Sequence, residues 1–260
     1  MNVIIMSVIA GVAGMGLGGL ITALFGGKSD KMTSIFLSFS GGVMISIVFL
    51  ELIPEAIKLS NLVIMIVGVI GGAVLVYLLN NLMDNLSRSG GKSKLHDTFA
   101  EFFHSGEILT KKSNMLRSGM IMLFAIALHN VPEGLAMGAA GHYDARLGIT
   151  LAIIIGLHNI PEGMAVTAPL IFGGLSKLKS VVITLIAGAT TVLGAVVGVL
   201  IGSISNIAVA LSFGAAGGAM LYVVVGEILP QSIVMSKDRI PTVFALLGMI
   251  VGMVFTELLH

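Results

Sequence analysis

Long apolar runs separated by mostly short polar connections make up this chain. A helix needs about 20 mostly apolar residues to cross the roughly 30 Å hydrocarbon core of a membrane. Only helices satisfy the backbone hydrogen bonds of single runs this apolar. Eight runs are long enough, at residues 2–25, 34–57, 62–83, 115–141, 147–172, 180–203, 207–234 and 242–259. The pattern predicts an all-α polytopic membrane protein, a single transmembrane domain over residues 1–260 with one long polar connection at 84–114.

The composition supports this fold class and narrows the chemistry. The chain is 56% hydrophobic and 10% charged, whereas soluble domains carry about 25% charged residues. A formal net charge of +1 provides no basic field, so no nucleic-acid partner is expected. The sequence has no cysteine, which excludes disulfides and thiolate metal ligands. Any bound metal would therefore be held by histidine, carboxylate and amide groups.

Lysine and arginine are distributed unevenly among the connections. Twelve of the fourteen lie in the first, third, fifth and seventh connections, and only Lys58 and Arg146 lie in the others. Cytoplasmic connections of membrane proteins carry an excess of basic residues. This rule puts the odd-numbered connections, including residues 84–114, in the cytoplasm and both termini outside.

Two pairs of related motifs indicate internal symmetry. HNVPEG (129–134) lies in the fourth run and HNIPEG (158–163) in the fifth, which have opposite directions. FLELIPEA (49–56) ends the second run and VVGEILPQS (224–232) ends the seventh, again with opposite directions. These pairs predict a 3+2+3 arrangement with inverted repeats. Such folds place the substrate site near the midplane, where interrupted helices meet.

The central motifs each place a histidine and a glutamate inside an apolar run. His129 and Glu133 are four positions apart, so they share one helix face, and His158 and Glu162 repeat this spacing. Ionisable groups within a span cost roughly 2.5–3.5 kcal/mol each on insertion scales and tend to mark a functional site. The four side chains would converge if the two faces meet.

The other polar and special residues of the motifs add to this picture. Pro132 and Pro161 each remove a backbone hydrogen bond and are expected to kink the two helices. The glycine that ends each motif permits close approach of a neighbouring helix. Asn130 and Asn159 lie about 100° around the helix from the histidines and can offer amide oxygens to a cation.

Two imidazoles, two carboxylates and two amide oxygens suit Zn²⁺, and would also accept Fe²⁺, Mn²⁺ or Co²⁺. Ca²⁺ or Mg²⁺ would be expected to use oxygen ligands alone. One alternative is a polar network that joins two helices without metal. Another is an intramembrane metalloenzyme with the histidine–glutamate pairs as its catalytic metal centre. The sequence has no His-Glu-x-x-His motif, and two symmetric motifs favour a passage over a catalytic centre.

The two HNxPEG motifs in the fourth and fifth of eight runs, with the polar connection after the third, resemble the ZIP (Zrt/Irt-like) metal transporters. The similarity is greatest to the broad-specificity bacterial branch and extends over essentially the whole chain. It implies a transporter in the plasma membrane (inner membrane) of a bacterium that imports divalent metal ions through a site between helices four and five. Zinc is the first expected substrate, with iron, manganese or cobalt as further ones.

The resemblance also implies partners and ligands. The expected partners are metal ions and the lipid bilayer, no cofactor is required, and the protein is not an enzyme; the oligomeric state is open, a homodimer being one alternative.

One metal position would use the four charged side chains, namely His129, Glu133, His158 and Glu162. The other would use Asn130 and Asn159, with both glutamates bridging. Many relatives add a span-six glutamate where this chain has Thr191, in GATTVLG. A neutral hydroxyl there predicts a second position that is weaker, absent or transient.

Further residues are candidates for supporting roles. Glu51 and Glu227, in the outer motifs, are candidates for the ion pathway, as is Thr191; the alternative for the two glutamates is that they reach interfacial water. His96 and His104 lie in the cytoplasmic segment LHDTFAEFFHSGE and are candidates for metal capture. The alternative interpretation of that segment is a short amphipathic helix at the membrane surface.

Overall fold

A computed structural model describes residues 3–25, 29–89, 112–143, 145–202, 205–236 and 238–259. Within these ranges the chain forms helices joined by short connections. The helical elements are α1 (Val3–Ser7), η1 (Val8–Ala13), α2 (Gly14–Phe25), α3 (Asp30–Ile47), η2 (Val48–Leu52), α4 (Ile53–Leu59), α5 (Leu62–Ser89), α7 (Lys112–Tyr143), α8 (Ala145–Phe172), α9 (Lys177–Gly202), α10 (Asn206–Val223), η3 (Val224–Ile228), α11 (Leu229–Ser236) and α12 (Ile240–Leu259). The predicted all-α class is confirmed.

Three of the long helices are each built from three consecutive elements. A π-helical turn joins α1 to α2 (η1), α3 to α4 (η2) and α10 to α11 (η3). Six helices in the described part of the chain are long and apolar enough to cross a membrane, and the apolar part of α5 spans Leu62–Leu78. The protein is therefore a polytopic membrane protein. The 3+2+3 arrangement stays a prediction.

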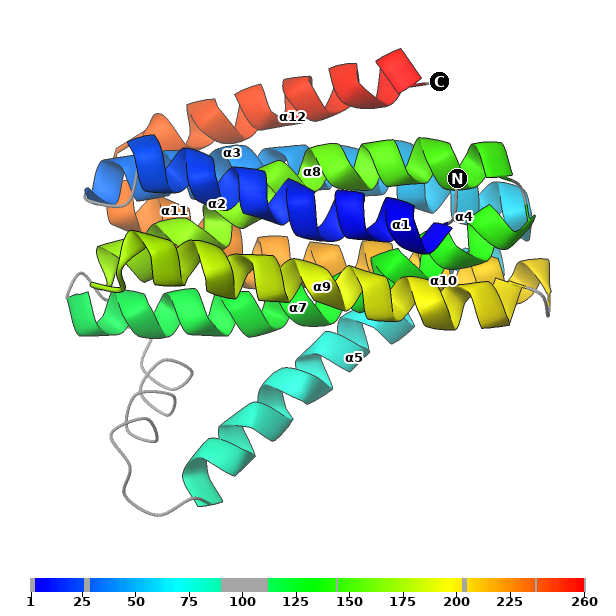
Figure 1. Cartoon of the computed structure of the whole chain (residues 1–260), viewed down its shortest axis with the longest axis horizontal. Coiled ribbons are helices and arrows are strands. Elements are labelled where there is room, and N and C mark those ends of the chain that lie inside the picture. Colours follow the sequence, from blue (N-terminus) through cyan, green and yellow to red (C-terminus); the bar gives the residue numbers. More distant parts are fainter. Residues whose placement is uncertain are drawn as a thin grey trace.

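Figure 1 shows an elongated bundle of antiparallel helices, with the N- and C-termini at the same end. α7 begins at the opposite end, and α5 lies obliquely to the other helices. α5 continues to Ser89 and α7 begins at Lys112, so helix extends into both ends of the predicted polar connection. His96 and His104 lie outside the described residues.

Side-chain caps fix several helix starts. Ser29 accepts a hydrogen bond from the Met32 amide, and Ser205 accepts one from the Ala208 amide, each at 3.2 Å. Both are N-caps that satisfy an amide at the start of a helix. Asp238 accepts hydrogen bonds from the Ser236 hydroxyl and the Ile240 amide, which hold the pKa of its carboxyl below the usual range.

The two outer motifs form similar structures. At the end of η2 the Ile53 amide donates a hydrogen bond to the Val48 carbonyl, and at the end of η3 the Leu229 amide donates one to the Val224 carbonyl. The donor and acceptor are five residues apart in each case. A proline follows directly in both motifs, and proline has no amide proton to continue the α-helical pattern. The predicted relationship between the motifs therefore extends to their backbone. By contrast, α7 and α8 continue as helices through Pro132 and Pro161.

Glycine stripes bring the flanking helices onto the central pair, α7 and α8. A Cβ on Gly134 would lie 2.9 Å from the Ala195 nitrogen, and one on Gly194 would lie 2.9 Å from the Leu135 nitrogen, so α7 and α9 meet backbone to backbone. On the other side, a Cβ on Gly18 of α2 would lie 2.8 Å from the Met164 nitrogen of α8. Small residues at such interfaces allow close helix packing within a membrane. They fix the position of α7 and α8, which carry the central motifs.

Adjacent glycines of α5 provide a test of this packing. A Cβ on Gly72 would lie 2.7 Å from the Cα of Ala215 in α10, whereas a Cβ on Gly71 would meet nothing within 4 Å. We expect Gly72→Ala to lower the free energy of unfolding by about 1–3 kcal/mol because it overpacks this interface. Gly71→Ala is the matched control and should leave stability unchanged. Unfolding of the purified variants in detergent measures both, and equal stability of the two would contradict the packing.

Candidate metal site

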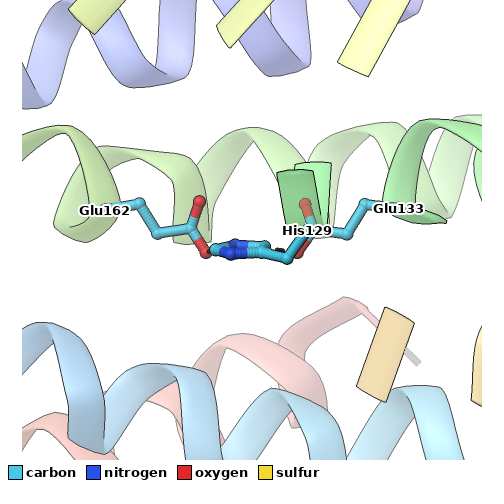
Figure 2. A group of neighbouring side chains, drawn as sticks. All are labelled: His129, Glu133 and Glu162. Carbon is cyan, nitrogen blue, oxygen red and sulfur yellow. Dashed lines mark hydrogen bonds and ion pairs between the residues drawn. The ribbon is translucent and has the colours of Figure 1, made fainter. Parts of the chain in front are cut away.

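The charged side chains of the two central motifs meet between α7 and α8. His129 and Glu133 extend from α7, and His158 and Glu162 extend from α8; all four are fully buried. Ligand atoms of His129, Glu133 and Glu162 lie within 4.8 Å of one another, a spacing that could hold a metal ion. Figure 2 shows the two glutamates extending toward each other, with the His129 ring between their carboxylates.

The closest contacts in this cluster run between the two helices. His129 Nε2 lies 3.0 Å from Glu162 Oε1, and His158 Nε2 lies 3.2 Å from Glu133 Oε2. Within each helix the corresponding distances are longer, 3.7 Å for His129–Glu133 and 3.9 Å for His158–Glu162. Each histidine therefore lies against the glutamate of the other motif.

Many oxygens around this cluster have no hydrogen-bond donor within the described chain. They are both carboxylate oxygens of Glu133, Glu162 Oε2, the Oδ1 atoms of Asn130 and Asn159, and Thr191 Oγ1. The 3.2 Å approach of His158 to Glu133 is close but lacks hydrogen-bond geometry. Buried carboxylates without donors are costly, and a divalent cation would supply the missing partner. Imidazole and carboxylate together suit zinc and similar transition metals.

The asparagines of the motifs contact the flanking helices. Asn159 Nδ2 donates to the Ala10 carbonyl in η1 at 2.9 Å. Asn130 Nδ2 lies 3.5 Å from the Ala187 carbonyl in α9. The sequence gives no signal for these two acceptors, because both are backbone carbonyl groups, and every residue has one whatever its side chain. Both asparagines are fully buried.

The motif glycines determine how closely the flanking helices approach. A Cβ on Gly134 would meet the Thr191 carbonyl of α9, and one on Gly163 would meet the Met15 carbonyl of α2. The expectation that these glycines permit close approach is thus confirmed. The partners are the flanking helices α9 and α2.

The remaining candidates are not among the four charged groups, and two of them lie outside the described residues. Thr191 is fully buried in α9, beside Gly134. Glu51 is 2% exposed in η2, and Glu227 is partly exposed in η3. Neither glutamate belongs to the cluster of ligand atoms at the central motifs. A loop-capture role for His96 and His104 falls outside the described residues.

Comparison with known proteins identifies the family. Residues 89–260 match the family described as ZIP zinc transporter. A zinc transporter ZupT of Chlorobium chlorochromatii is 34% identical over 247 residues, covering 92% of this chain and 89% of the relative. The ZupT proteins of Streptococcus mutans (31% identical, 96% of this chain and 92% of the relative) and Campylobacter jejuni (33%, 92% and 89%) are similar too.

The chain belongs to the ZIP family of metal transporters. The predicted class, a multi-pass membrane protein that imports divalent metal ions and is not an enzyme, is confirmed. The alternative of an intramembrane metalloenzyme is therefore set aside.

The contacts between helices predict a measurable coupling. In a double-mutant cycle on the metal-free protein, His129→Ala and Glu162→Ala should show a coupling of at least about 1 kcal/mol in the free energy of unfolding, because the two groups lie 3.0 Å apart. The pair His158→Ala and Glu162→Ala, 3.9 Å apart in one helix, is the control and should couple less. Unfolding in detergent with a chelator measures both cycles. A larger coupling within the helix than between the helices would contradict this arrangement.

Proposed function

We propose that the cluster between α7 and α8 is the transport site, and that the protein carries Zn²⁺ into the cytoplasm, with Fe²⁺, Mn²⁺ or Co²⁺ as further substrates. The observation that carries the proposal is the convergence of two imidazoles and two carboxylates, all fully buried, from two helices. His129, Glu133, His158 and Glu162 are the proposed ligands. Zinc is named first because the similar proteins are called zinc transporters.

The ligand set suits release as well as binding. Each histidine already lies against a glutamate of the other helix, so the site can re-form these pairs when the metal leaves. A cation that departs therefore leaves each carboxylate beside an imidazole that can donate a hydrogen bond, and not as an isolated charge in the membrane interior, where it would be costly. Transport requires such a balance, since an ion held too firmly would not be released.

We propose a weaker second position beside the first. Asn130 and Asn159 each have a buried Oδ1 without a donor, and the two glutamates have further free oxygens. Thr191 can add only a neutral hydroxyl, whose Oγ1 is buried and also has no donor among the described residues. With neutral oxygens in place of a further carboxylate, the charge available to a second dication is smaller. One firmly bound ion is therefore the proposed resting occupancy.

The proposed path continues beyond the central cluster. Glu51 and Glu227 lie in the π-helical turns of two other long helices, α3–η2–α4 and α10–η3–α11, and occupy equivalent positions in their motifs. A carboxylate in such a position can attract a cation toward the bundle. We propose that the two residues serve the path on opposite sides of the transport site.

Uptake into liposomes tests the transport site. We expect His129→Ala and Glu162→Ala each to lower the initial rate of Zn²⁺ uptake at least about tenfold, because the loss of a direct ligand should cost no less than the loss of a group that supports one. Glu257→Ala is the matched control, since Glu257 is exposed on α12. The rates for Mn²⁺ and Fe²⁺ rank the substrates. Unchanged uptake in both site variants would contradict a path between α7 and α8.

The proposed orientation has both termini outside and the α5–α7 connection in the cytoplasm, following the basic residues. Lys177 and Asn206 are the exposed first residues of α9 and α10, and the chain has no cysteine of its own. We expect a membrane-impermeant thiol reagent applied to intact cells to label Asn206→Cys and not Lys177→Cys. Both should be labelled after permeabilisation, which is the control. The reverse pattern, or labelling of both in intact cells, would contradict the orientation.

A further inference from the structure

The π-helical turn η1 near the start of the chain changes the hydrogen bonding of its carbonyls, that of Ala10 among them. In an unbroken α-helix the amide four residues later, Gly14, would donate to this carbonyl. Here the Gly14 amide is instead directed at the carbonyls of Ile9 and Gly11. The turn therefore removes the α-helical donor of the Ala10 carbonyl, which is buried and still needs a partner.

The side chain of Asn159 supplies that partner. Its Nδ2 donates to the Ala10 carbonyl at 2.9 Å, an ordinary length for this kind of bond. The nitrogen must face Ala10, because the Oδ1 atom would repel a carbonyl oxygen. Oδ1 therefore points away from Ala10, and it is buried with no donor among the described residues. The bond thus decides which atom of the amide is left for a cation.

Close packing holds the asparagine against this turn. A Cβ on Gly14 would lie 2.8 Å from the Cβ of Asn159 and 2.7 Å from the Gly156 carbonyl. A Cβ on Gly156 would lie 3.4 Å from the Cα of Ala10. Only glycine at position 14 leaves room for Asn159 at its present distance. The first helix therefore approaches α8 closely at the residue that the Ala10 carbonyl binds.

The equivalent asparagine of the other motif is held less firmly. Asn130 Nδ2 lies 3.5 Å from the Ala187 carbonyl, at the limit of a hydrogen bond. α9 is one continuous α-helix, and the Ala187 carbonyl also accepts the Thr190 hydroxyl at 2.7 Å. No π-helical turn releases this carbonyl. The two motifs have nearly the same sequence. Only the asparagine of the second motif, Asn159, binds a carbonyl that has lost its α-helical donor.

We propose that the Ala10 carbonyl, released by the π-helical turn η1, is a positioning group that orients the Asn159 amide so that its Oδ1 serves a cation at the second, weaker position. The first helix is then part of the metal site without contributing a side chain to it. This inference rests on the proposed function. It makes Asn159, and not Asn130, the amide that contributes more to the affinity of the second position.

Deletion of Ile9 tests the role of the turn. Ile9 is 55% exposed, and its removal shortens η1 by one residue, so that a continuous α-helix can return the Gly14 amide to the Ala10 carbonyl. The apparent Kd of the purified full chain for the second, weaker Zn²⁺ ion is measured on protein that already holds one Zn²⁺, by competition with a chromogenic chelator. The deletion should weaken binding about 10–100-fold, the usual cost of losing a group that orients a ligand. Unchanged affinity would overturn the inference.

Combined variants separate positioning from general damage. The deletion should weaken binding by the same factor when combined with Asn130→Ala, but should have no further effect when combined with Asn159→Ala, because its effect acts through Asn159. Equal losses in all backgrounds would show a merely structural role and overturn the inference. If the unaltered chain binds no Zn²⁺, the proposed function fails as well. If the unaltered chain binds Zn²⁺ but the deletion weakens binding equally in all backgrounds, the inference alone is overturned and the proposed function stands.

A second pair of variants keeps the test open if the deletion does not fold. Gly14→Ala adds a methyl group against Asn159 and should weaken binding of the second Zn²⁺ ion at least about tenfold and alter the absorption spectrum of the protein loaded with Co²⁺. Gly16→Ala is the matched control in the same helix, because its Cβ would meet only the Leu185 side chain, which can move. Binding and spectra unchanged in Gly14→Ala would overturn the inference.

Discussion

The cost of burying two carboxylates and two imidazoles in the middle of a membrane protein is the constraint on which the site depends. Each histidine offsets part of that cost by lying against the glutamate of the other helix, at 3.0 Å for His129–Glu162 and 3.2 Å for His158–Glu133. Several carboxylate and amide oxygens stay without donors among the described residues. The candidate site therefore combines partly compensated charges with oxygens that are left to serve a cation.

Close backbone packing makes this arrangement possible. The glycines that end the two motifs, Gly134 and Gly163, lie against the backbones of α9 and α2, so the flanking helices exclude lipid from the cluster. The same closeness brings backbone carbonyls within reach of Asn130 and Asn159. Candidate ligands and helix packing are thus encoded together in six consecutive residues, so a change at a glycine of the motif is expected to disturb the candidate site as well.

Much of the fold and of the site can be predicted from the sequence, because both have a periodic signal. Apolar runs of membrane-spanning length predict the helices, and the spacing of His129 and Glu133, repeated at His158 and Glu162, predicts two faces that meet. The sequence does not reveal that the closest pairs form between the helices, since this depends on the relative height of α7 and α8. None of the three π-helical turns is predicted from the sequence. A proline follows η2 and η3 and is a signal for them, but none follows η1.

The most direct test of the central claim is to locate the metal itself. A crystal structure of the full chain with Zn²⁺, with data collected above and below the zinc absorption edge, gives the position of the ion without assumptions about its ligands. The account predicts one strong anomalous peak between α7 and α8, within bonding distance of imidazole nitrogens and carboxylate oxygens of the two central motifs. A peak elsewhere in the bundle, with none between these helices, would contradict it.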